Sequence, residues 1–205
     1  MQEELEDQNF VIIAAAQDTE GWAAAGEWYD RAEPTYVALV DVQHRVSSLY
    51  NLVNVPSAIW VDEQGQVVRI NEGTYTQTYN FGTLEFGTDE YAPAVRDWAR
   101  KGAESEFVWT PEEVTGKIRS RTSDEELAEP NFKLGVYFYE SGNETLANTY
   151  WERAEQLFPD SWNYARQDWS FTPEEAGTNW SEKFDGLGDR PYYAPLDLQS
   201  ETDGR

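Results

Sequence analysis

The chain contains no cysteine, and this absence sets the first limit on its chemistry. Thiol–disulfide exchange needs a thiolate nucleophile, and neither serine nor threonine attacks a disulfide at neutral pH. The only histidine, His44, lies near the start of a predicted helix with no nucleophile beside it, so we expect a solvated surface side chain. Phosphate-binding loops, zinc spacings and calcium loops are also absent from the sequence. The sequence therefore predicts no catalytic residue, no metal site and no cofactor.

Basic residues are scarce: Lys and Arg number 15 against 39 Asp and Glu, which gives a net charge of −24. A field of this sign repels phosphate backbones and anionic lipid, so we expect no nucleic-acid partner and no membrane-surface role. Two explanations of the acidity stay open, a solvated and soluble surface or adaptation to high salt, where screening removes self-repulsion. The low number of lysines is compatible with the second explanation; they are Lys101, Lys117, Lys133 and Lys183.

Long hydrophobic runs are missing as well. No run approaches the roughly 18 apolar residues that a membrane helix needs, so membrane insertion is not expected. Residues 1–7 are acidic where a secretory signal is basic, and on this ground we expect a cytoplasmic protein. Hydrophobic residues still make up 40% of the chain, with nine Trp, which predicts a packed core. The length of 205 residues allows one large core, or a domain of about 100 residues with a helical appendage.

The most informative stretch runs from Asn54 to Ile70. Apolar residues with β preference at 58–61 are followed by turn residues, and the apolar pattern resumes at 67–70, which together predict a hairpin. Pro56 stands at the start of the first strand, one of the few strand positions that tolerate proline. Because cis peptide bonds are essentially confined to X-Pro sequences, we expect the bond before Pro56 to be cis.

Strands and helices alternate on either side of this hairpin. Residues 10–16 form a short apolar run without alternation, which favours a strand buried on both faces of a parallel sheet. The other expected elements of this half are a helix capped by Thr19, a strand at 36–41, a helix at 44–52, a loop at 71–90 and a helix at 91–101.

A Val-Pro pair, an apolar strand, an Asp-x-x-Gly turn and a second strand, as at 55–68, resemble the hairpin that carries the cis-proline loop of thioredoxin-like proteins. With its order of strands and helices, the first half of the chain resembles the redoxin branch, meaning the thiol-disulfide reductases and peroxiredoxin-like antioxidants. The resemblance implies an α/β fold in which Val55 and Pro56 contact the backbone of a substrate polypeptide. The family reaction needs redox cysteines, which this chain lacks.

The resemblance also implies a strand running into Trp-Cys-x-x-Cys, and a long helix after it, upstream of Phe10. Glu3 to Leu5 resemble the end of that helix. The strand is the central one of the family's sheet, between the strands at Phe10 and Ser57, and its absence leaves two edges with unpaired N–H and C=O groups. Four explanations stay open: a misassigned start at Met1, a gene fragment, a strand donated by a partner, or direct closure into a four-stranded sheet.

The second half of the chain is predicted to be helical. Thr110-Pro111-Glu112 has the chemistry of a helix start, and Ser123 or Asp124 is the expected cap of another short helix. One stretch of this half resembles a lone tetratricopeptide unit, which consists of two antiparallel helices that pack closely through small residues. Gly142-Asn143 is the turn, and the residues that carry the resemblance are Leu134, Gly135, Phe138, Ala147, Trp151, Ala154 and Pro159. Such a unit cannot bury its own face, so a plain hairpin packed on the sheet and a true peptide-binding groove both stay open.

The predicted fold class is α/β, an incomplete thioredoxin-like sheet with flanking helices at 1–103. A helical extension follows at 104–205, with the tetratricopeptide-like hairpin at 131–159 and a tail that wraps it. The first functional hypothesis is a redoxin-family protein, related to thiol-disulfide oxidoreductases, that is a fragment or catalytically inactive. The second is a non-enzymatic interaction module based on the helical half. A protein partner would bind through the Pro56 loop or through the helical hairpin.

Overall fold

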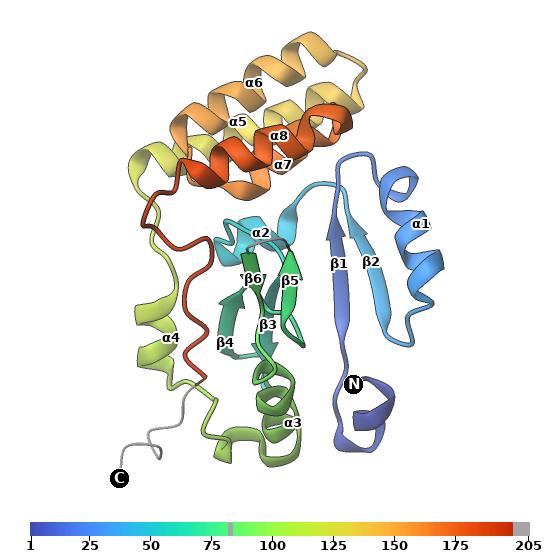
Figure 1. The fold of residues 1–205 in the computed structure, drawn as a ribbon, viewed down its shortest axis with the longest axis vertical. Coiled ribbons are helices and arrows are strands. Elements are labelled where there is room, and N and C mark those ends of the chain that lie inside the picture. The colour runs from blue at the N-terminus through green and yellow to red at the C-terminus, as the bar shows by residue number, and fades with distance from the viewer. Residues whose placement is uncertain (82–83, 199–205) are drawn as a thin grey trace.

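The computed structural model describes residues 1–81 and 84–198 (Figure 1). It is a mixed α/β protein in which two-stranded sheets occupy the first half of the chain and helices the second. The elements in chain order are η1 (Glu3–Gln8), β1 (Ile13–Gln17), α1 (Trp22–Ala32), β2 (Val37–Asp41), α2 (Arg45–Tyr50), β3 (Ser57–Val61), β4 (Val67–Glu72), β5 (Tyr79–Phe81), β6 (Leu84–Phe86), α3 (Tyr91–Lys101), η2 (Gly102–Glu104), α4 (Pro111–Lys117), α5 (Ser123–Glu140), α6 (Glu144–Leu157), α7 (Trp162–Ser170) and α8 (Pro173–Asp185).

Strands β1 and β2 form a parallel pair, joined by helix α1, in which Ile13 is in register with Val37. The Tyr29 hydroxyl of α1 reaches the pair and donates to the carbonyl oxygen of Leu39 at 2.9 Å. The expectation that β1 is buried on both faces is wrong, because Ile13 is 62% exposed and Leu39 is 50% exposed. A two-stranded sheet that is covered by one helix keeps an open apolar face.

Strands β3 and β4 form the predicted hairpin, antiparallel and with Ser57 in register with Glu72. The side chain of Asp62 accepts from the N–H groups of Gln64 and Gln66 and so forms the turn. The Val55–Pro56 bond at the entrance to β3 is cis, as the sequence predicts.

The sheets of the described residues stay separate, and β1 is not hydrogen-bonded to β3. The direct closure into a four-stranded sheet is therefore contradicted. The carbonyl oxygen of Ile12 accepts from the N–H of Val37 at 3.2 Å, so the even-numbered residues turn their peptide groups toward β2. In a parallel ladder the alternate residues point the other way. The peptide groups of Ile13, Ala15 and Gln17 therefore face an unpaired edge.

Strand β3 also has an unpaired edge, because among the described strands it is hydrogen-bonded only to β4. The carbonyl oxygen of Pro56 accepts from the N–H of Gly73 at 2.8 Å, which places Pro56 among the residues that face β4. The next residue, Ser57, and then Ile59 turn their peptide groups away from β4, since successive strand residues alternate in an antiparallel ladder.

The loop expected at 71–90 contains a short hairpin instead. Strands β5 and β6 pair antiparallel, with Tyr79 in register with Phe86. Helix α3 follows at Tyr91–Lys101, as predicted, and Gly102 is its C-cap. It packs on the β3–β4 hairpin, where the Trp60 ring stacks on that of Trp98 at 4.8 Å between centroids and the Trp60 indole N–H donates to the Tyr91 hydroxyl at 2.8 Å. These contacts belong to one of the two apolar cores of the described residues.

The helical half begins as the sequence predicts, with Thr110 as the N-cap of α4 in a capping box with Glu113. Helix α4 ends at Lys117, and α5 is one long helix rather than the short one expected. Its N-cap is Thr122, in a capping box with Glu125, and not Ser123 or Asp124. The hydroxyl of Thr122 reaches the free N–H of Glu125, which makes it the better cap.

Helices α5 and α6 pack closely where small residues face large ones. A Cβ atom added to Gly135 would lie 2.3 Å from Cδ1 of Trp151, so the indole rests directly on the α5 backbone. Trp151 is 1% exposed and stacks on Phe171 at 5.1 Å between centroids, just after α7. The second core is therefore made by α5, α6 and α7 and does not rest on a sheet, while Leu134 stays 39% exposed.

Candidate functional site

The predicted contact residues Val55 and Pro56 lie in the loop between α2 and β3, which buried polar side chains hold in place. Asn54 is fully buried at 0% exposed, and its Oδ1 accepts from the N–H of Val55 at 2.9 Å. Glu72 at the end of β4 accepts from the N–H groups of Val53 and Asn54 at 2.8 and 3.2 Å. Burial of this carboxylate raises the pKa of Glu72. The conformation of the loop is thus fixed by the hairpin behind it.

The carbonyl oxygen of Val55 is engaged by the C-terminal half. Arg166 of α7 donates to it from Nη1 at 3.0 Å, and the Tyr193 hydroxyl donates to it at 2.9 Å. Arg166 also donates to the hydroxyl of Tyr192, which fixes its guanidinium between the loop and the tail. Both hydrogen-bonding groups of Val55, which the resemblance assigns to polypeptide binding, therefore have partners within this chain.

The tail has a second anchor in Arg69 of β4, which is 1% exposed. Its Nη2 donates to the carbonyl oxygens of Leu196 and Asp197 at 2.5 and 2.8 Å, and its Nη1 donates to that of Phe107 at 2.6 Å. Its Nε donates to Oδ1 of Asn71 at 2.7 Å. Each of the three guanidinium nitrogens thus donates at least one hydrogen bond, and the acceptors are mostly backbone carbonyls.

Figure 1 shows the course of this tail, which leaves α8 and descends past the sheets between α4 and β4. The tail at 192–197 therefore lies against the β3–β4 hairpin, and not around the α5–α6 hairpin that the sequence led us to expect. The reason is the Arg69 guanidinium, because a buried cation needs acceptors and the tail carbonyls supply them.

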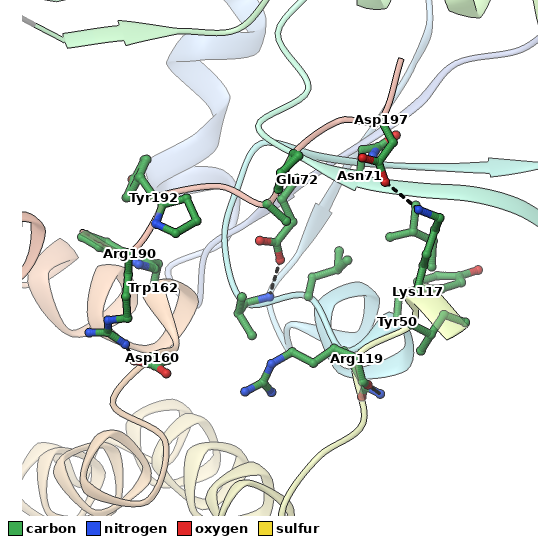
Figure 2. Close-up of a pocket in the computed structure, with 18 of the residues that line it drawn as sticks. Tyr50, Asn71, Glu72, Lys117, Arg119, Asp160, Trp162, Arg190, Tyr192 and Asp197 are labelled. Carbon is green, nitrogen blue, oxygen red and sulfur yellow. Dashed lines mark hydrogen bonds and ion pairs between the residues drawn. The ribbon is translucent and has the colours of Figure 1, made fainter. Parts of the chain in front are cut away.

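A pocket of about 530 Å³ opens between the tail and the loop before β3 (Figure 2). Its wall is largely apolar, and Glu72 reaches into it from the end of β4. The cations on its wall are paired: Lys117 with Asp197 at 2.5 Å, Arg119 with Glu125 at 2.5 Å and Arg190 with Asp160 at 2.9 Å. Because these charges are neutralised, the pocket suits an apolar or aromatic side chain better than an anion. Its larger apolar side chains are Tyr50, Leu52, Ile70, Trp109, Ile118, Trp162, Leu187 and Tyr192.

His44 is buried, at 3% exposed, so the expectation of a solvated histidine is wrong. Its Nε2 lies 2.7 Å from Oε1 of Gln167 and 3.3 Å from Oγ1 of Thr19, because α7 packs over the start of α2. Thr19 is consequently part of this contact and does not cap α1, whose N-cap is Gly21. Burial lowers the pKa of His44 to about 4, and the ring is neutral at pH 7. The cluster joins the two halves of the molecule and has no nucleophile activated by the ring.

Glu155 of α6 is another group whose pKa is strongly shifted. Its pKa is raised to about 7, chiefly by burial; the charge of Asp168 adds to the shift and that of Lys183 opposes it. Its Oε1 is buried without a hydrogen-bond partner among the described residues. Within residues 1–81 and 84–198, no group of three or more Asp, Glu or His side chains is placed to hold a metal ion. Nor does any described helix have the length and apolar character needed to cross a bilayer.

Three residues at the site were not found by reading the sequence, namely Arg69, Arg166 and Tyr193. Arg69 carries a signal, because it interrupts an apolar strand between Val68 and Ile70, where a charged side chain needs a buried partner. The other two belong to segments whose contacts are far away in the chain, and nothing local marks them. No known protein family, curated protein or solved structure matches this chain, so its site is characterised by this geometry alone.

Proposed function

We propose that this chain is a thioredoxin-like protein without thiol chemistry, and that its activity is the binding of an extended polypeptide beside the Val55–Pro56 loop. The order of elements around the loop and the β3–β4 hairpin support the likeness. With no cysteine in the sequence, this chain has no thiolate to attack a disulfide. Binding is the part of the family's chemistry that can remain.

The observation that carries the proposal is the pair of unpaired edges on β1 and β3. An extended polypeptide satisfies such edges by adding a strand, and its main-chain hydrogen bonds then supply the affinity. The open face next to the β1 edge is apolar, with Ile13 at 62%, Val37 at 47% and Leu39 at 50% exposed. Alternate side chains of an added strand would cover this face. The strand could come from a partner, which is one of the explanations that the sequence leaves open.

The test uses proline as a probe of each edge, because proline removes one N–H donor. Ala15→Pro removes a donor from the unpaired edge of β1, whereas Ala38→Pro removes one from the outer edge of β2. The two alanines sit in mid-strand of the same parallel pair, and each has its N–H on the side away from the other strand, so the two substitutions are matched in position. The measurement is binding of a fluorescent, permanently unfolded carboxymethylated polypeptide, followed by anisotropy.

We expect wild type and Ala38→Pro to bind alike and Ala15→Pro to bind about tenfold more weakly, which is the effect of one or two lost backbone hydrogen bonds. Circular dichroism of both variants controls for folding. Equal binding by the two variants, or failure of the wild-type protein to bind, would refute the proposal.

A second candidate is a binding surface on helix α5, favoured by its exposed apolar side chains. Leu127 is 55%, Leu134 39% and Tyr137 60% exposed, and their spacing places them on one side of the helix. Under this candidate, Leu127→Lys abolishes polypeptide binding and Ala15→Pro leaves it unchanged. The two variants together therefore separate the edge of β1 from the face of α5.

A further inference from the structure

Residues 192–197 lie against the body of the protein in the way that a bound peptide would. Their backbone carbonyls are contacted by side chains from elsewhere in the chain: Tyr192 by Asn54 Nδ2 at 3.3 Å, and Leu196 by Arg69 Nη2 at 2.5 Å and Asn71 Nδ2 at 3.2 Å. The Asp197 carbonyl also accepts from Arg69. These donors recognise main-chain atoms and are independent of the sequence that is bound.

Two tail side chains add specific contacts. The Tyr193 ring lies on the backbone of Gly73, where an added Cβ atom would come within 2.7 Å of Cγ, and its hydroxyl donates to the Val55 carbonyl at 2.9 Å. Four residues further on, the carboxylate of Asp197 pairs with Lys117 at 2.5 Å. The surface under the tail thus binds the hydroxyl of a tyrosine and the carboxylate of an aspartate that are separated by three residues.

We propose that Val55, Arg69, Asn71, Lys117 and Arg166 form a peptide-binding groove, that residues 192–197 are its intramolecular ligand, and that an outside polypeptide with the pattern Tyr-x-x-x-Asp displaces them. The inference rests on the proposed function, because it assigns the Val55 side of the same polypeptide site. It adds the ligand's pattern and a regulatory step, since the tail must leave before the Val55 carbonyl becomes available.

The specific contacts that hold the tail can be exchanged with an outside peptide. The Lys117–Asp197 pair is exposed, at 37% and 51% for the two side chains, so water can enter and compete. Ala194 and Pro195 between the anchors are exposed as well. A peptide of the same pattern offers the groove the same contacts, which makes displacement a matter of concentration.

The experiment measures the anisotropy of a labelled peptide with the sequence of residues 190–198, added to the full chain. The double variant Tyr193→Phe with Asp197→Asn weakens the tail but leaves the groove intact. We expect it to bind the peptide about tenfold more tightly than wild type, from the loss of one hydrogen bond and one exposed ion pair in the competing tail. The exposed Asp189→Asn is the matched control and should bind as wild type does. A peptide with Ala at the Tyr193 and Asp197 positions should bind to neither.

A second readout keeps the wild-type contacts between the groove and the tail, so it does not depend on the folding of the double variant. Because the chain has no cysteine, Ala194→Cys gives a single labelling site for an environment-sensitive dye. Saturating peptide should shift the dye emission to that of a solvated tail. Lys117→Ala removes the same ion pair from the tail and from the peptide, so the peptide concentration required should stay within about twofold of that for wild type. An unmoved dye, or equal affinity for the patterned and alanine peptides, would overturn the inference.

The outcomes for the two proposals can be distinguished. If the dye does not move but binding of the unfolded polypeptide is still lost in Ala15→Pro, the tail is a fixed strap and the proposed function stands. If the peptide displaces the tail but the unfolded polypeptide does not bind, the groove is confirmed and the strand-adding function is refuted.

Discussion

The guanidinium of Arg69 donates to the backbone carbonyl of Leu196 at 2.5 Å and so joins two residues that are 127 positions apart in the chain. The contact closes the C-terminal tail over β4 and brings the tail hydroxyl of Tyr193 onto the Val55 carbonyl. One buried arginine therefore links the helical half, through the tail, to the candidate site.

Arg69→Met should destabilise the protein by about 3 kcal/mol or more, because backbone carbonyls that now accept from a cation lose their donor. Arg69→Lys should recover less than half of this loss, since an ammonium group lacks the planar fork of donors. Urea unfolding measures both. Arg31→Met is the control, because Arg31 is exposed and lies 3.8 Å from Glu27, and it should cost under about 0.5 kcal/mol. A loss of similar size in the control would show that the effect comes from general charge.

Gly135→Ala should destabilise the protein by about 1–3 kcal/mol, although alanine is the better helix former. The new methyl group would meet the Trp151 indole at 2.3 Å, and the buried indole has no space to move into. Gly177→Ala on α8 is the matched control, because no atom lies within 4 Å of its added Cβ. That variant should gain up to about 1 kcal/mol. Thermal unfolding of the pair checks the prediction, and an unchanged or stabilised Gly135→Ala would contradict the packing of α5 on α6.

Glu155 should make stability fall as the pH rises. Its pKa is raised from 4.5 to about 7 in the folded state, so between these values the unfolded chain is ionised while the folded one keeps its proton. The folded state loses on the order of 3 kcal/mol across this window, with no further loss above it. Glu155→Gln should remove this falling contribution from urea midpoints measured at pH 4 to 8. A fall in stability above pH 6.5 that persists in the variant would assign it to another group.

His44 should have the opposite effect, with full stabilisation above pH 6.5 that is lost as the pH falls toward 4. The cause is burial, since the folded state resists the protonation that the unfolded chain accepts. His44→Asn keeps a residue that tolerates the positive φ of 51° and should abolish this slope. Because the two windows overlap between pH 4.5 and 6.5, the slopes of His44 and Glu155 largely cancel in wild type. Each single variant should therefore expose the slope of the other group.

Local chemistry explains where reading the sequence succeeds. The β3–β4 hairpin follows from Asp62 and its turn, the start of α4 from the Thr110 capping box, and the cis bond from the position of Pro56. In each case the deciding atoms lie within a few residues of one another, so the pattern and the structure share one cause.

Long-range contacts explain where it fails. Whether His44 is exposed depends on Gln167 in α7, and the position of the tail depends on Arg69, more than a hundred residues away in either case. The apolar run at 10–16 predicts burial, but burial needs a covering layer, and α1 provides one on a single face of the β1–β2 pair. The candidate site combines both situations. Val55 and Pro56 are named by a resemblance that rests on a local pattern, whereas Arg166 and Tyr193, which bind the Val55 carbonyl, have no local signal.

The separation of the β1–β2 pair from the other sheets has a consequence for how the molecule opens. Within this unit the strands pair with each other, and α1 packs on β2, while the N–H of Thr19 donates to Gln167 across to the helical half. A unit with few attachments unfolds locally at a lower free energy than the whole protein. Amide hydrogens of β1 and β2 should accordingly exchange with deuterium through a local opening. Those in the buried contact of α5 with α6 should exchange only through global unfolding.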